Sequence, residues 1–169
     1  MLESERSHGK VRILKKLLFV CSGNTCRSPL AEGIAQKIFP EGLSEKVDIS
    51  SAGSTAVDGL PASPLAIEVA GKYSIDLSKH KARVLSRGLV KGADLIIAMS
   101  SKHKDTVGVM EPSALDYTYL LTDFCDGESE DIPDPIGLAV EEYEKTYRIL
   151  ENCIRGLAEK LGSFEGWKK

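Results

Sequence analysis

The sequence predicts one α/β domain in three layers (α/β/α), in which helices flank a parallel sheet of about four strands. Short apolar runs of strand length alternate along the chain with segments of helical periodicity, the order expected for a parallel sheet covered on both faces. The run at residues 94–99 is apolar after its first residue, as in a strand buried on both faces. A length of 169 residues, 42% of them hydrophobic and 28% charged, fits one compact domain.

The individual elements follow from periodicity. In the first expected helix Leu30, Ile34 and Ile38 share one face, and Pro29 stands where a helix start tolerates proline. The last helix has an apolar stripe at alternating spacings of 4 and 3, and it ends at Gly162: Tyr143, Tyr147, Leu150, Ile154, Leu157 and Leu161. Strands are expected at 15–21, 46–51, 94–99 and 117–121, and helices at 28–39, 63–72, 100–109 and 143–161.

Composition bounds the organisation of the chain. Residues 1–14 are charged and aperiodic and are expected to form a flexible tail, whereas residues 15–162 form the domain. A net charge of −3 argues against nucleic-acid binding. No apolar run is long enough to cross a membrane or to serve as a signal core, so a cytoplasmic protein is expected. Four cysteines without a CxxC pair indicate neither a disulfide scaffold nor a zinc module.

The loop at residues 21–28 carries the chemistry. Successive backbone N–H groups in a loop that contains Gly23 can converge on an anion, and the helix that follows adds its positive end. Arg27 supplies a planar fork for two phosphate oxygens. The same field is expected to lower the pKa of Cys21 and favour a thiolate. The residues alone also allow a buried structural cysteine beside an arginine that forms a surface ion pair.

A family resemblance narrows this choice. The string VCSGNTCRSPLAE at 20–32 closely resembles the signature of low-molecular-weight protein-tyrosine phosphatases. The similarity continues at SAG (51–53), HKAR (80–83), ADLIIAM (93–99) and Asp134-Pro135, and covers about residues 15–161. It implies a phosphotyrosine-phosphatase I-like fold and hydrolysis of phosphorylated proteins through a cysteinyl-phosphate. It implies no metal or cofactor, and a monomer or weak dimer is expected.

The resemblance also implies roles for single residues. Cys21 is the nucleophile, Arg27 binds the phosphoryl oxygens, and Ser28 bonds to the thiolate. Asn24 holds the loop in a strained shape, and His80 supports that asparagine. The remaining loop residues complete the phosphate cradle: Ser22, Gly23, Thr25 and Cys26.

The general acid is expected in the acidic stretch that precedes the last helix. Six residues there could serve: Asp123, Asp126, Glu128, Glu130, Asp131 and Asp134. Apolar, stiff flanks at Ile132, Pro133 and Pro135 favour the protonated form of Asp134, and the Asp-Pro motif of the family falls on the same residue. The residues alone also allow Asp134 to serve only as a turn.

The sequence leaves two candidates for the phosphorylated residue of the substrate, phosphotyrosine and phosphoarginine. Ile136 and Gly137 stand where tyrosine-directed relatives carry aromatic side chains, and Thr25 replaces their usual Ile or Leu. A threonine there resembles the protein-arginine phosphatases of the same family. Its hydroxyl could bond to a guanidinium or to the attacking water, and this favours phosphoarginine as the substrate.

The sequence also leads to expectations for the three cysteines other than Cys21. Cys26 could form a reversible disulfide with Cys21, whereas Cys125 and Cys153 are expected to carry no chemistry.

An arsenate reductase would need two further, closely spaced cysteines that the middle of the chain lacks. A silent phosphoprotein-binding module would usually lose the nucleophile or the acid. Three scattered histidines argue against a metal-dependent hydrolase: His8, His80 and His103.

Overall fold

The computed structural model describes residues 11–127, 130–162 and 167–168. Its centre is a four-stranded sheet in the order β3–β2–β4–β5, and each neighbouring pair runs parallel. The strands are β2 (Lys16–Cys21), β3 (Asp48–Gly53), β4 (Leu95–Ala98) and β5 (Thr118–Leu120). Every residue of β4 is fully buried, as its apolar run predicts. Phe19 pairs with Ser51 on one side and with Ile97 on the other, so β2 is central.

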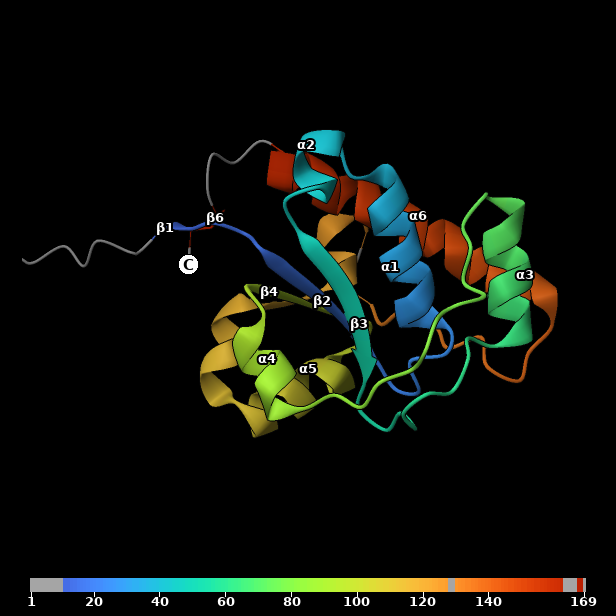
Figure 1. Cartoon of the computed structure of the whole chain (residues 1–169), viewed down its shortest axis with the longest axis horizontal. Helices are drawn as coiled ribbons and strands as arrows, with labels where there is room; N and C mark the ends of the chain where they lie inside the picture. The colour runs from blue at the N-terminus through green and yellow to red at the C-terminus, as the bar shows by residue number, and fades with distance from the viewer. Residues whose placement is uncertain (1–10, 128–129, 163–166, 169) are drawn as a thin grey trace, which may run out of the picture.

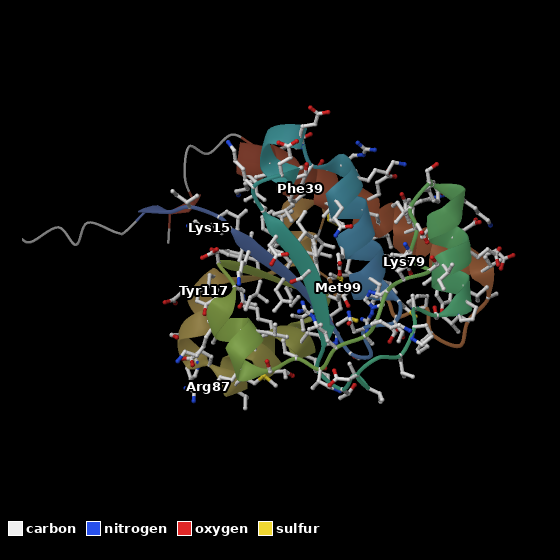
Figure 2. The ribbon with its side chains drawn as sticks, in the orientation of Figure 1. Lys15, Phe39, Lys79, Arg87, Met99 and Tyr117 are labelled. Atoms are coloured by element: carbon white, nitrogen blue, oxygen red, sulfur yellow. A yellow bond between two sulfur atoms is a disulfide. The ribbon has the colours of Figure 1, made fainter. Side chains whose placement is uncertain are left out.

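Helices cover both faces of the sheet and complete the predicted three layers (Figure 1). One face carries α1 (Arg27–Ile38), α3 (Pro64–Lys72) and α6 (Val140–Gly162), which enclose the larger core. The other carries α4 (Arg87–Gly92), α5 (Ser101–Met110) and η1 (Pro112–Tyr117) around the smaller core. Figure 2 shows Met99, next to the end of β4, inside the fold. All six apolar-stripe residues of α6 are buried. None of the helices in the described ranges could cross a membrane.

Short elements are where structure and prediction differ. The sequence predicts neither α2 (Glu41–Ser44), α4, η1 nor η2 (Leu121–Phe124), because one or two turns are too short to show a period. Strand β3 also begins two residues later than expected. The predicted flexible tail falls largely on residues 1–10, outside the described residues. Its residues Val11–Arg12 form β1 and pair antiparallel with Trp167–Lys168 (β6).

The acidic loop, residues 123–134, is fastened to α6 near its start. A disulfide joins Cys125, just after η2, to Cys153 of α6, so the expectation of no chemistry for these two cysteines is wrong. They are 28 residues apart in the sequence, and only the packing of η2 on α6 brings them together. Gly156 makes this packing possible, because a Cβ there would overlap the carbonyl oxygen of Phe124.

A methyl group at Gly156 is therefore expected to destabilise the fold. Gly156→Ala must push η2 away from α6, and we expect the free energy of unfolding to fall by about 1–3 kcal/mol. Gly71→Ala is the matched control in α3, where an added Cβ meets nothing within 4 Å; it leaves stability unchanged or raises it by up to about 1 kcal/mol. Urea unfolding followed by circular dichroism measures both. Equal stability of the two variants would contradict the close approach.

Candidate active site

The loop at residues 21–28 lies at the carboxyl edge of the sheet, where ligands of parallel α/β folds bind. Strand β2 ends at Cys21 and α1 begins at Arg27. Gly53, the last residue of β3, lets the loop come close, because a Cβ there would overlap the carbonyl oxygen of Ser22. Ser54 then donates its backbone N–H to the carbonyl oxygen of Cys21 at 2.9 Å. The loop is thus fixed to the neighbouring strand.

Asn24 organises the interior of the loop. It is fully buried and adopts a left-handed backbone with φ 56°, which asparagine tolerates better than most residues. Its Nδ2 donates to Ser28 Oγ at 2.8 Å and to Ser51 Oγ at 2.9 Å, and its Oδ1 accepts the backbone N–H of Arg83 at 2.9 Å. His80 Nε2 lies 2.8 Å from its carbonyl oxygen. Every polar group of the Asn24 side chain is used to hold the loop.

The Cys21 thiol faces a hydroxyl whose direction is set by Asn24. Ser28 Oγ lies 2.8 Å from Cys21 Sγ, and it already accepts a hydrogen from Asn24 Nδ2. The hydroxyl hydrogen of Ser28 is therefore available to the sulfur, which also receives the N–H of Asn24 at 3.3 Å. These donors lie where they would stabilise a thiolate.

Burial nevertheless controls the acidity of this thiol. Cys21 is 2% exposed, and desolvation raises its pKa above the ordinary value for cysteine. The hydrogen bonds from Ser28 and Asn24 and the charge of Arg27 lower this pKa, but they are outweighed. The sequence prediction of a lowered pKa is wrong in this respect, because desolvation of the buried thiol outweighs the donors and the positive charge around it.

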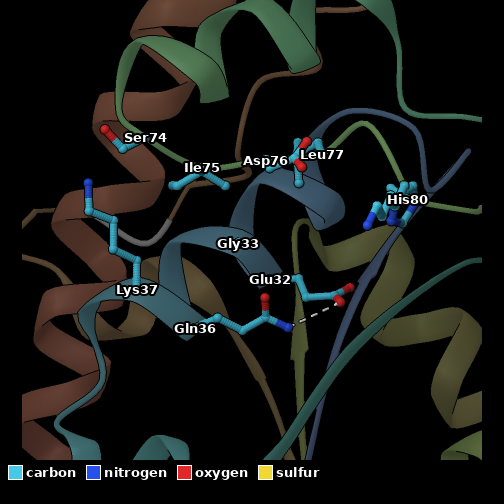
Figure 3. A pocket seen from close by; sticks show the side chains of 10 residues that line it. Glu32, Gly33, Gln36, Lys37, Ser74, Ile75, Asp76, Leu77 and His80 are labelled. Carbon is cyan, nitrogen blue, oxygen red and sulfur yellow. Dashed lines mark hydrogen bonds between the residues drawn. The ribbon is translucent and has the colours of Figure 1, made fainter.

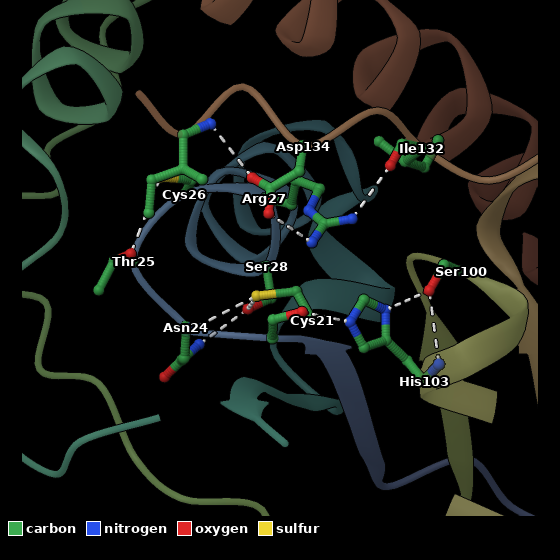
Figure 4. A network of polar contacts seen from close by, with 12 residues as sticks. Cys21, Asn24, Thr25, Cys26, Arg27, Ser28, Ser100, His103, Ile132 and Asp134 are labelled. Atoms are coloured by element: carbon green, nitrogen blue, oxygen red, sulfur yellow. Dashed lines mark hydrogen bonds and ion pairs between the residues drawn. The ribbon is translucent and has the colours of Figure 1, made fainter. Parts of the chain in front are cut away.

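Arg27 is a buried cation, and one of its three guanidinium nitrogens has no described hydrogen-bond partner. It is 5% exposed; its Nη1 donates to the carbonyl oxygen of Ile132 at 3.1 Å and its Nη2 to Asp134 Oδ2 at 3.0 Å (Figure 4). Its buried Nε has no hydrogen-bond partner among the described residues. The first turn of α1 contains no acidic residue of its own, so the positive end of this helix can attract an anion.

The acidic loop is fastened beside the thiol by its backbone. Ile132 donates its N–H to the carbonyl oxygen of Met99 at 2.8 Å, and Asp131 accepts the N–H of Ser101 at 2.7 Å. These bonds place Asp134 against Arg27, with 41% of its side chain exposed. Of the six acidic candidates, Glu128 lies outside the described residues.

The remaining loop residues line its outer turn. Cys26 Sγ lies 3.2 Å from Ser63 Oγ and 3.4 Å from the hydroxyl of Tyr143, which ties the loop to α3 and α6. Cys21 and Cys26 are both free thiols. Thr25 is half-buried, and its Oγ1 lies 3.8 Å from Cys26 Sγ. A Cβ at Gly23 would lie 3.5 Å from that Oγ1, an ordinary contact.

His103 is the site residue that sequence reasoning missed. It lies on α5, is 2% exposed, and its Nε2 lies 2.8 Å from Ser22 Oγ. One signal could have found it: β4 runs parallel to β2, so residues just after β4 belong to the same sheet edge as the loop.

A separate cavity of about 470 Å³ lies behind the loop, between α1 and residues 74–80 (Figure 3). Glu32 and His80 in its lining each reach the loop scaffold, Glu32 by accepting the hydroxyl of Ser51 and His80 through Asn24. No group of three or more His, Cys, Asp or Glu side chains within the described ranges is arranged to hold a metal ion.

Comparison with known proteins gives consistent results. Residues 16–164 match the model of the family described as low molecular weight phosphotyrosine protein phosphatase. The chain is 36% identical over 146 residues to a protein-arginine-phosphatase of Bacillus subtilis, covering 86% of this chain and 95% of that protein. It is also 36% identical over 151 residues to the low molecular weight protein-tyrosine-phosphatase Wzb of Escherichia coli K12, covering 89% and 98%.

A solved structure shares the fold as well. It is a cysteine-to-serine mutant of the YwlE arginine phosphatase with a phosphorylated active-site serine. It superposes with a TM-score of 0.81 at 32% identity and covers 89% of this chain and 97% of that one.

The fold, the thiol loop and these relatives together define a Cys-dependent protein phosphatase. The chain belongs to the low molecular weight phosphotyrosine protein phosphatase family.

Removing the Ser28 hydroxyl is expected to raise the pKa of Cys21, because the hydrogen bond from Ser28 lowers it. In a Cys26→Ser background, Ser28→Ala moves the midpoint of iodoacetamide alkylation to higher pH. The alkylation rate constant measured against pH reports the thiolate fraction. Ser113→Ala on η1, where the hydroxyl bonds Glu111 instead, is the control that leaves the midpoint in place. An unchanged midpoint in Ser28→Ala would show that this hydroxyl does not stabilise the thiolate.

Proposed function

We propose that this phosphatase hydrolyses phosphoarginine on proteins in preference to phosphotyrosine, with Cys21 as nucleophile and Asp134 as general acid. The observation that carries the chemistry is the buried guanidinium of Arg27, whose Nε–H lacks a partner in the described part of the chain. An unpaired buried donor is costly, and a phosphoryl oxygen beside Cys21 would pair it.

The proposed first step transfers the phosphoryl group to sulfur. The Cys21 thiolate attacks phosphorus, the S–P bond forms and the P–N bond of phosphoarginine breaks. Asp134 donates its proton to the leaving nitrogen. Arg27 binds two equatorial oxygens and neutralises the charge that they carry. The phosphorylated serine in the related arginine-phosphatase mutant supports a phosphoryl acceptor at this loop position.

The proposed second step returns the enzyme to its starting state. Water attacks phosphorus, Asp134 takes the proton of that water, and the S–P bond breaks to release phosphate and the Cys21 thiolate. The hydroxyl of Ser28 faces this sulfur and stabilises the departing thiolate.

The proposed substrate preference rests on Thr25 and on the exposed side chains that follow Asp134. The only hydrogen-bond contact of the Thr25 hydroxyl in the described residues is a weak one, at 3.8 Å to Cys26, so it retains bonding capacity for a guanidinium or for water. Ile136 is 59% exposed and Leu138 is 51% exposed after Asp134. These aliphatic side chains offer a phosphotyrosine ring no aromatic stacking partner.

We further propose a cytoplasmic enzyme that acts as a monomer or weak dimer, without nucleic acid and without a metal or cofactor. The proposed steps need only a thiolate, a guanidinium and a carboxyl group. The proposed nucleophile must be a free thiol, and Cys21 and Cys26 are both free. Residues 15–162 supply all of these groups as one catalytic domain.

The substrate preference is tested with one phosphoarginine peptide and one phosphotyrosine peptide, with chelator and reductant present. We expect a higher kcat/KM for phosphoarginine. Thr25→Val keeps the shape and removes the hydroxyl, and it is expected to reduce the preference about five- to tenfold, the worth of one hydrogen bond. Thr25→Ser keeps the hydroxyl and most of the preference.

Two other outcomes would contradict the proposed function. A wild-type preference for phosphotyrosine that Thr25→Val leaves unchanged would reject phosphoarginine as the substrate. No phosphate release from either peptide, with Cys21→Ser as the inactive reference, would leave a phosphoprotein-binding module.

The acid role of Asp134 predicts a dependence on the leaving group. Asp134→Asn keeps the size of the side chain but cannot donate the carboxyl proton. We expect kcat/KM for phenyl phosphate to fall about 100-fold or more, and kcat/KM for p-nitrophenyl phosphate, whose leaving group needs less protonation, to fall much less. Equal losses for the two esters would assign Asp134 a binding role only.

A further inference from the structure

His103 is a buried titratable group that the proposed chemistry does not use. Its imidazole lies between α5 and the phosphate loop, with Nε2 2.8 Å from Ser22 Oγ and Nδ1 2.8 Å from Ser100 Oγ. Figure 4 shows the His103 ring between Ser100 and Cys21. Both ring nitrogens are therefore in hydrogen bonds, and the direction of each bond can be worked out.

Ser100 determines which ring nitrogen carries the proton. Its Oγ accepts the backbone N–H of His103 as the N-cap of α5. The side chain is buried, and the described hydrogen bonds offer its hydroxyl hydrogen one acceptor, His103 Nδ1. A buried hydroxyl hydrogen takes the acceptor available to it. Nδ1 is therefore the accepting nitrogen and Nε2 carries the proton.

The charges around the ring keep it neutral. Burial, Arg27 and Lys102 lower the pKa of His103, whereas Asp131 and Asp134 raise it. The net result is a pKa of about 4, so the ring is neutral near pH 7.

This tautomer determines what Ser22 can do. Nε2–H donates to Ser22 Oγ, so the serine oxygen acts as the acceptor in that bond. The hydroxyl hydrogen of Ser22 is then free to point elsewhere, and the described hydrogen bonds give it no acceptor. Ser22 is half-buried and adjoins Cys21 in the loop.

We propose that His103 is a positioning residue that fixes the Ser22 hydroxyl as a further hydrogen-bond donor to the phosphoryl group bound at the loop. The proposal rests on the proposed function for the identity of that group. Ser100, His103 and Ser22 form one directed chain that runs from the N-terminus of α5 to the phosphate loop. A phosphoryl oxygen accepts the hydrogen at its end, and no covalent bond changes.

The test is a double-mutant cycle on phosphate binding. Ser22→Ala, His103→Ala and the double variant are titrated with inorganic phosphate by calorimetry, which needs no turnover. We expect each single variant to weaken binding about three- to tenfold, the effect of one hydrogen bond. The double variant is expected to bind no more weakly than either single variant, because His103 acts through Ser22.

Two further variants separate positioning from stability. His103→Gln restores an N–H donor toward Ser22 and is expected to bind phosphate within about twofold of wild type. Val107→Ala opens the core under the same helix, where Val107 is fully buried. It is expected to lower Tm and leave phosphate affinity unchanged.

These experiments distinguish a failure of the His103 proposal from a failure of the proposed function. Additive losses in the double variant, or unchanged phosphate affinity in His103→Ala, would overturn the positioning role. Wild-type protein that binds phosphate but releases none from either phosphopeptide would remove the proposed function, and the same cycle would still decide the role of His103. Wild-type protein that binds no phosphate would overturn both.

Discussion

The burial of one guanidinium organises this site. A charged group removed from water costs several kcal/mol unless partners compensate for the lost solvation. Arg27 finds two of these partners in the acidic loop, at Ile132 and Asp134, about a hundred residues away in the sequence. That loop must therefore lie over the thiol, and its bonds to Met99 and Ser101 hold it there. The disulfide and Gly156 fasten the start of the same loop to α6, so the acidic loop is held near both of its ends.

The same burial acts on the thiol in two opposing ways. Loss of water raises the pKa of Cys21, and this effect outweighs the donors around the sulfur. A dry site also strengthens every hydrogen bond that reaches the thiolate. Ser28 and Asn24 have little freedom to turn away from the sulfur, because every polar group of the Asn24 side chain is already hydrogen-bonded. The reactivity of Cys21 thus depends on a rigid scaffold that extends to Ser51, His80 and Arg83, and a change behind the loop reaches the sulfur through these contacts.

Periodic features were predictable from sequence and contacts between distant segments were not. The apolar run in β4 and the stripe in α6 predict their elements because burial acts on every residue of a long segment. The types and order of residues 21–28 predict the loop, because each type has a distinct chemical use there. The pairing of Cys125 with Cys153 depends on how η2 packs on α6, and the depth at which β2 ends decides the pKa of Cys21. No role at the loop was predicted for His103, because one histidine after a strand has no pattern around it, although the parallel register of β2 and β4 places it there.

The ion pair between Arg27 and Asp134 relates substrate binding to acid catalysis in the proposed mechanism. A general acid must face the leaving group, and in this structure Asp134 Oδ2 instead accepts a hydrogen bond from Arg27 Nη2 at 3.0 Å. A phosphoryl group that binds Arg27 competes for the same N–H donors and brings negative charge close to Asp134. Both changes release the Asp134 carboxyl group from Arg27 at the moment when the leaving group needs a proton. Because the side chain of Asp134 is 41% exposed, it can turn from Arg27 toward the leaving group without unpacking the core. The contact that satisfies the buried cation before substrate arrives is therefore the one that substrate must displace, and this displacement prepares the acid.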